Sequence, residues 1–223
     1  MAPVIYNTEI DSFCALWQRC QQNDPGDNPG AELHHQLLLA YGEPHRVYHT
    51  LRHIQSCFRI FQDVVHLAVN ADALALAIWF HDAIYDIDAK DNEQRSADWF
   101  LKETDGIFDD SLRDLVSSHI MATMHCGEDI KGHDSQIMVD IDLFSFGKPW
   151  PEFLRDSENV RAEKADVSDT EFYPKQCGFQ KFLLDQPRFF QSDYFYRHYE
   201  KQARQNLTRF MALIEQKISG ICE

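Results

Sequence analysis

Residues 74–86, LALAIWFHDAIYD, constrain the fold of this 223-residue chain more than any other segment. The run predicts a helix that is apolar on nearly every side, and such helices lie in the centre of a bundle. His81 and Asp82 interrupt the apolar pattern. Because an ionisable pair that is buried without partners costs several kcal/mol, we expect other polar groups to meet these two side chains inside the protein.

Helical periodicity dominates the rest of the sequence. Apolar side chains recur at steps of three and four residues along 48–68, which is typical of an amphipathic helix. Residues 109–124, 135–146 and 194–216 predict three more helices. No alternating run rich in Val, Ile and Thr stands out between hairpin turns. We therefore expect an all-α fold, and the chain is long enough for a single domain with its own core.

The composition restricts the partners. A formal net charge of −15 argues against a nucleic-acid polymer, which requires clustered Lys and Arg, whereas a bound cation would allow a small anionic ligand. No stretch reaches the ~18 apolar residues of a membrane span, and residues 1–13 lack a signal-peptide pattern. The six cysteines form no C-x-x-C pair. We expect a reduced, cytoplasmic protein without membrane contact, and a homo-oligomer stays open.

A second apolar segment also carries acids. Residues 137–146, IMVDIDLFSF, contain Asp140 and Asp142 in a run that predicts another central helix. One helix earlier in the chain, His49 and His53 are four residues apart and are expected to share a helical face. Imidazoles and carboxylates that converge in a core either pair with one another or bind a divalent cation. Both interpretations are open at this point.

The ordered set His53, His81–Asp82 and Asp142 resembles the motif of the HD-domain superfamily of metal-dependent phosphohydrolases. The strings YGEPHRVYHTLRHI, AIWFHDAIYD, NEQRSA, DIDLFSFG and ARQNL are similar to one bacterial and fungal branch of predicted HD-type hydrolases. The resemblance covers about residues 33–207. It implies a single all-α domain of the HD type over residues 1–223, with its core in 33–207.

The resemblance implies four metal ligands, namely His53, His81, Asp82 and Asp142. Asp140 is the alternative for the last position. Residues two apart on a helix point about 200° away from each other, so one aspartate is expected to ligate and the other to lie outside the ligand set. Asp142 is preferred because it directly precedes a leucine, as the last aspartate of the superfamily usually does.

Further positions match the branch outside the metal motif. We expect His49, His125 and Arg161 to contact the substrate, and Asp86 or Glu93 to act as the general acid or base. Asp86 is expected one helical turn beyond Asp82. Each role has a structural alternative: His49 could orient a ligand, and Glu93 could favour the helix dipole. Arg161 belongs to an R-x-E string with Glu163; Lys164 stands where the branch usually has Tyr.

The function implied is hydrolysis of a small phosphoester, such as a nucleotide, by water that a divalent metal ion activates. The imidazole and carboxylate ligands suit Mn, Fe, Zn, Co, Ni or Mg without deciding among them. Two other functions are open. One is a di-iron oxygenase, which needs extra His ligands such as His119 or His125. The other is a ligand-binding module that holds a metal without turnover.

Overall fold

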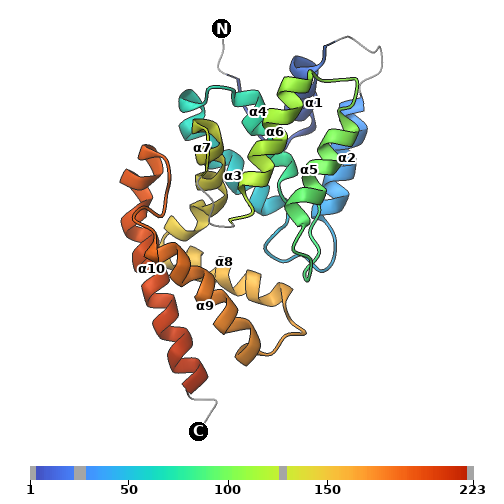
Figure 1. Ribbon diagram of the computed structural model, residues 1–223. Helices are drawn as coiled ribbons and strands as arrows, with labels where there is room; N and C mark the ends of the chain where they lie inside the picture. The colour runs from blue at the N-terminus through green and yellow to red at the C-terminus, as the bar shows by residue number, and fades with distance from the viewer. Residues whose placement is uncertain (1–3, 23–28, 126–129, 220–223) are drawn as a thin grey trace. The chain divides into compact units, whose positions relative to one another are not determined.

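The computed structural model describes residues 4–22, 29–125 and 130–219, and regular secondary structure in these residues is entirely helical. The α-helices are α1 (Ile10–Cys20), α2 (Pro29–Tyr41), α3 (Leu51–Val64), α4 (Ala71–Phe80), α5 (Asn92–Glu103), α6 (Asp110–Ala122), α7 (His133–Leu143), α8 (Trp150–Glu163), α9 (Asp169–Asp185) and α10 (Asp193–Ser219). Two short 3₁₀ helices, η1 (Val65–Leu67) and η2 (Phe144–Gly147), follow α3 and α7. The predicted all-α class is confirmed (Figure 1).

Contacts between backbone positions divide the chain into two compact units, residues 1–142 and 143–223. The boundary falls at the last residue of α7. The single domain over residues 1–223 stays a prediction, and each unit is described by itself. None of the helices in the described residues is both long enough and apolar enough to cross a membrane.

Helix α4 forms the centre of the first unit. It packs against α1, α3, α5 and α6, which lie around it in Figure 1, and every side chain from Ala73 to Phe80 is buried. The side chain of Asn70 caps its N-terminus by accepting the N–H of Ala73. Burial on all sides follows from the absence of a polar face, as the sequence predicts.

The end of α4 differs from the sequence prediction. The helix stops at Phe80, with His81 as its C-cap, so residues 81–86 form a turn and loop rather than more helix. Ser96 of α5 fixes this loop, because its hydroxyl accepts the N–H of Ile84 at 3.0 Å. The expectation that Asp86 lies one helical turn beyond Asp82 is therefore wrong.

Helix α3 begins later than the periodicity predicts. Thr50 is its N-cap, and the Thr50 hydroxyl accepts the N–H of Arg52 at 3.3 Å. His49 therefore precedes the helix, and the prediction that it shares a helical face with His53 is wrong. The loop before α3 nevertheless brings His49 near His53, with ring centroids 6.2 Å apart.

The second unit comprises η2 and α8–α10 and has an aromatic core. Its buried rings include Phe153, Phe189, Phe190 and Phe195. Gly147 of η2 meets Tyr199 of α10 so closely that a Cβ there would lie 2.7 Å from the Cβ of Tyr199, which excludes any larger residue without a shift.

Candidate metal centre

Two imidazoles meet in the core of the first unit. Nε2 of His53 on α3 lies 3.1 Å from Nε2 of His81 at the end of α4, and both residues are buried. Nδ1 of His81 donates to the carbonyl oxygen of Ile78 at 3.0 Å. This bond assigns the proton of a neutral ring to Nδ1 and leaves Nε2 of His81 as a lone-pair donor.

Two carboxylates complete the cluster. Oδ2 of Asp82 lies 3.2 Å from Nε2 of His81 and 3.5 Å from Nε2 of His53. Oδ1 of Asp142, from α7, lies 3.3 Å from Nε2 of His53 and 3.5 Å from Nε2 of His81. One ligand atom from each of the four residues lies within 4.8 Å of the others, so the set could hold a metal ion.

The polar atoms of this cluster are better placed to coordinate a cation than to form hydrogen bonds with one another. Oδ2 of Asp82 is buried and finds no hydrogen-bond donor of acceptable geometry among the described residues, although Nε2 of His81 is 3.2 Å away. A buried carboxylate oxygen without a partner is costly. Two nitrogen and two oxygen ligands are a set that Mn, Fe, Co, Ni and Zn accept.

The charges of the cluster stabilise one another. Burial disfavours the charged form of His81, but the carboxylates of Asp82 and Asp142 outweigh it and hold its pKa well above 6.5. Burial likewise opposes ionisation of Asp82, yet His81, His49 and His53 lower its pKa. Burial opposes ionisation of Asp142 too, and hydrogen bonds from His125, His53 and His81 hold its pKa well below 3.8.

A buried arginine that the sequence analysis missed holds the turn that carries the ligands. Arg46 donates to the carbonyl oxygens of Asp82 at 2.7 Å, Ala83 at 3.0 Å and His49 at 3.1 Å. Its guanidinium also lies over the ring of Tyr41, 5.3 Å from the centroid. The only signal in the sequence is its place in the string EPHRVYH, because residue type alone does not distinguish a buried arginine from an exposed one.

His125 contacts Asp142, one of the four candidate metal ligands. Its Nε2 lies 2.8 Å from Oδ2 of Asp142, and its backbone has φ = +50°, a left-handed conformation that is uncommon outside glycine. This contact can fix the orientation of Asp142 toward the two imidazoles. A contact between His125 and a substrate stays a prediction.

Two other polar residues of the core lie outside the donor set. Asp140 is fully buried, and the group of ligand atoms contains Asp142 in its place. His119 of α6 is buried, and its Nδ1 lies 2.9 Å from the hydroxyl of Ser135 in α7. Metal ligation by Asp142 in preference to Asp140 stays a prediction.

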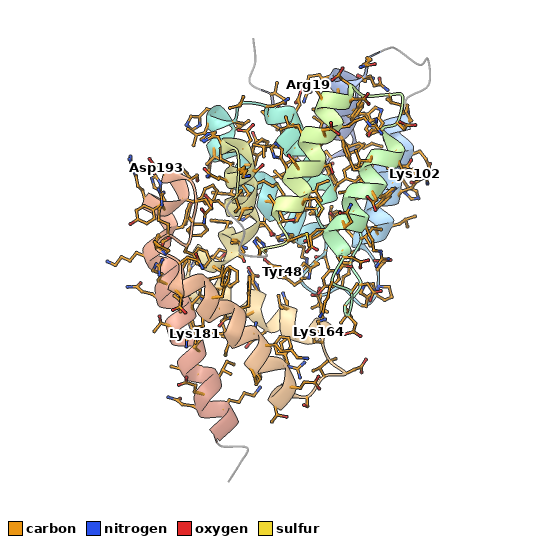
Figure 2. All side chains as sticks on the ribbon, in the orientation of Figure 1. Arg19, Tyr48, Lys102, Lys164, Lys181 and Asp193 are labelled. Atoms are coloured by element: carbon orange, nitrogen blue, oxygen red, sulfur yellow. The ribbon has the colours of Figure 1, made fainter. Side chains whose placement is uncertain are left out.

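The ring of His49 lies close to the rings of Tyr48 and Tyr85 and to that of His53 in the cluster. The His49 ring stacks on Tyr85 with centroids 4.1 Å apart, and the electrostatic influence of His49 helps to lower the pKa of Asp82. Tyr48, labelled in Figure 2, lies with its ring 5.1 Å from that of His53. The side chains of Asp82 and Asp142 are 16% and 17% exposed, which leaves the carboxylate side of the cluster in contact with solvent.

The two candidate acid–base residues lie in different environments. Glu93, in the first turn of α5, is half-buried. Burial raises its pKa, and the nearby carboxylates of Asp82 and Asp142 raise it further. Asp86 is 61% exposed and lies 3.9 Å from Arg95. Glu93 is therefore the candidate whose pKa the carboxylates of the cluster raise.

Arg161 lies in the second unit and its guanidinium has structural partners. Nε donates to Asp169 at 2.8 Å, Nη1 to the carbonyl oxygen of Lys164 at 2.6 Å and Nη2 to that of Val167 at 2.7 Å. These bonds hold the connection between α8 and α9. They give no support to the predicted contact with a substrate.

No family model, curated protein or solved structure matches the chain.

Proposed function

We propose that the chain is a metal-dependent hydrolase of the HD-domain type that acts on a small phosphoester, such as a nucleotide. The observation that carries the proposal is the convergence of four ligand atoms within 4.8 Å, together with the unsatisfied Oδ2 of Asp82. The resemblance of the ordered motif to HD phosphohydrolases supplies the reaction class. The same proposal includes a cytoplasmic location. It also excludes a nucleic-acid polymer as a partner, because the net charge of −15 disfavours binding to a phosphate backbone.

His53, His81, Asp82 and Asp142 would hold the cation. A divalent ion in this set would act as a Lewis acid toward a phosphoryl oxygen and make water nucleophilic at neutral pH. The bond from His81 to Ile78 keeps Nε2 directed at the centre. Asp142 is oriented in the same way by His125.

Proton transfer is assigned to Glu93. A carboxyl group with a raised pKa can take the proton of the attacking water and return a proton to the leaving oxygen near neutral pH. Glu93 has a raised pKa and lies close enough to Asp82 and Asp142 to feel their charge. Asp86, which the resemblance also allows, is directed at solvent and Arg95.

Turnover tests the proposal directly. The full chain, loaded in turn with Mn²⁺, Co²⁺, Ni²⁺, Zn²⁺ and Mg²⁺, is assayed against a panel of nucleotides and sugar phosphates. We expect metal-dependent release of phosphate that Asp82→Asn abolishes. Asp91→Asn is the matched control, because Asp91 is exposed and lies 4.0 Å from Arg95.

Two outcomes would replace the proposal. Oxygen uptake by the iron-loaded chain without release of phosphate would favour a di-iron oxygenase. Tight metal binding without turnover of any phosphoester would favour a ligand-binding module. His119 gives the di-iron alternative no support, because its Nδ1 is directed at the hydroxyl of Ser135.

A further inference from the structure

A thiol lies against the two imidazoles of the candidate metal centre. Cys57 follows His53 by one turn of α3 and so shares its face. Its Sγ lies 3.6 Å from Nε2 and 3.9 Å from Nδ1 of His53, and the residue is 2% exposed. The sulfur also faces the carbonyl oxygen of Ile141, 3.9 Å away. Cys57 of α3 therefore lies against the last turn of α7, which carries Asp142.

The ligand atoms of the centre form two overlapping groups. His53, His81, Asp82 and Asp142 make one group, and His53, Cys57 and His81 make the other, each with its ligand atoms within 4.8 Å of one another. The two imidazoles belong to both groups. The first group adds only oxygen ligands, whereas the second adds only sulfur.

Sulfur and oxygen ligands select different cations. Thiolates favour Zn²⁺, Cu⁺ and other soft ions, while carboxylates and water suit Mg²⁺ and Mn²⁺. A buried thiolate is stabilised by a bound cation, and the thiol loses its proton to solvent as the sulfur–metal bond forms. A soft cation therefore gains more from Cys57 than from either carboxylate.

We propose that the centre has two exclusive coordination modes that share His53 and His81. Oxygen-seeking cations take the mode with Asp82 and Asp142, and thiophilic cations take the mode with Cys57. The inference rests on the proposed function in one respect, namely that the carboxylate mode is the hydrolytic one. Thiophilic cations then displace the hydrolytic metal ion from the two imidazoles. Cys57 is therefore the residue that determines metal selectivity.

Displacement of Mn²⁺ by Cd²⁺ tests this proposal. The full chain loaded with Mn²⁺ is titrated with Cd²⁺, while free Mn²⁺ is followed by its electron paramagnetic resonance and sulfur-to-cadmium charge transfer by ultraviolet absorption. We expect a charge-transfer band to appear as Mn²⁺ is released in equal amount. Release without a band would mean that Cd²⁺ uses the carboxylates, and a band without release would mean that a different thiol binds it; either result overturns the two-mode proposal.

Matched variants separate the modes. Cys57→Ala should remove the band and weaken Cd²⁺ binding by more than about tenfold. Loss of a residue that only orients a metal ligand already lowers affinity by about tenfold or more, and loss of a ligand should cost more. Asp82→Asn should keep the band while losing Mn²⁺. Cys20→Ala is the control, since Cys20 is also a buried cysteine but lies in α1; it should behave as the wild type. If Cys57→Ala does not fold, as judged by circular dichroism, Cys57→Ser takes its place.

The proposal and the proposed function can fail separately. A band that survives in Cys57→Ala, or that disappears in Cys20→Ala, overturns the thiolate mode and leaves the carboxylate site and its activity intact. A chain that binds Cd²⁺ through Cys57 yet turns over no phosphoester with any metal overturns the hydrolase and leaves the thiolate mode standing.

Discussion

Nε2 of His53 lies 3.1 Å from Nε2 of His81, although 28 positions separate the two residues in the chain. Because Nδ1 of His81 donates to the carbonyl oxygen of Ile78, Nε2 of His81 faces the other ring, with a lone pair when the imidazole is neutral and with an N–H when it is protonated. Asp82 and Asp142 add two negative charges beside it. A shared proton or a cation is needed between these groups, and the unsatisfied Oδ2 of Asp82 favours the cation.

Loss of either imidazole should release the metal. We expect His81→Ala to contain no stoichiometric transition metal after purification without chelator, because half of the nitrogen ligands are gone. His119→Ala is the control: His119 of α6 is also a buried histidine, but its Nδ1 lies 2.9 Å from the hydroxyl of Ser135 in α7, outside the ligand cluster. Elemental analysis by mass spectrometry measures both. Equal metal content in the two variants would place the ion elsewhere in the protein.

Metal removal should lower the melting temperature. Without a metal cation, only the neighbouring imidazoles compensate the two negative charges of Asp82 and Asp142, which are mostly buried and repel each other. By mass action, a ligand at 100 times its dissociation constant stabilises the folded state by about 2.7 kcal/mol. Calorimetry of the chelator-treated and reloaded chain measures the difference, and identical melting temperatures would argue against a site in the core.

The stability of the metal-free chain should fall on the alkaline side of neutrality. The raised pKa of His81 means that the folded state binds this proton more tightly than the unfolded state. Its contribution is complete below about 6.5 and is lost as the pH rises through the raised value. Asp82 and Asp142, whose pKa values are lowered, are ionised in both states there and add no slope.

Melting temperatures over this pH range, with chelator present, test the assignment. His81→Gln should lack the alkaline decline, and so should the metal-loaded wild type, in which Nε2 carries no proton. A decline of the same size in His81→Gln would assign it to another group.

Glu93 should be required for turnover but not for metal binding. We expect Glu93→Gln to lower kcat by about 10²- to 10⁴-fold, the range for a lost general acid or base, with unchanged metal content. Glu103→Gln, at the other end of α5, is the matched control and should keep full activity. If Asp86→Asn shows the large loss and Glu93→Gln does not, proton transfer belongs to Asp86, as the sequence resemblance also allows.

The sequence predicts the central helix of the fold because the burial of that helix follows from its own residues. An apolar run without a polar face has to be enclosed, and α4 is enclosed on all sides. The prediction fails at the helix ends, since the stop at Phe80 depends on the loop bonds of Ser96 and the start at Leu51 on the cap of Thr50. Both decide where side chains such as His49 and Asp86 point.

The sequence could not predict the roles of residues that act through tertiary contacts. Arg46 supports the site by donating to three carbonyl oxygens, and backbone acceptors leave no trace in residue types. Cys57 looks like an ordinary core position of an amphipathic helix, and only its distance to His53 distinguishes it.

The position of the metal is the most direct test of the central claim. Crystals of the full chain loaded with Mn²⁺ or Co²⁺, measured on both sides of the absorption edge of the metal, give an anomalous difference map that locates the ion without assumptions about its ligands. We predict one peak per chain between Nε2 of His53, Nε2 of His81 and the carboxylates of Asp82 and Asp142. A fully loaded crystal with its peak at any other place, and none between these four side chains, would contradict the claim.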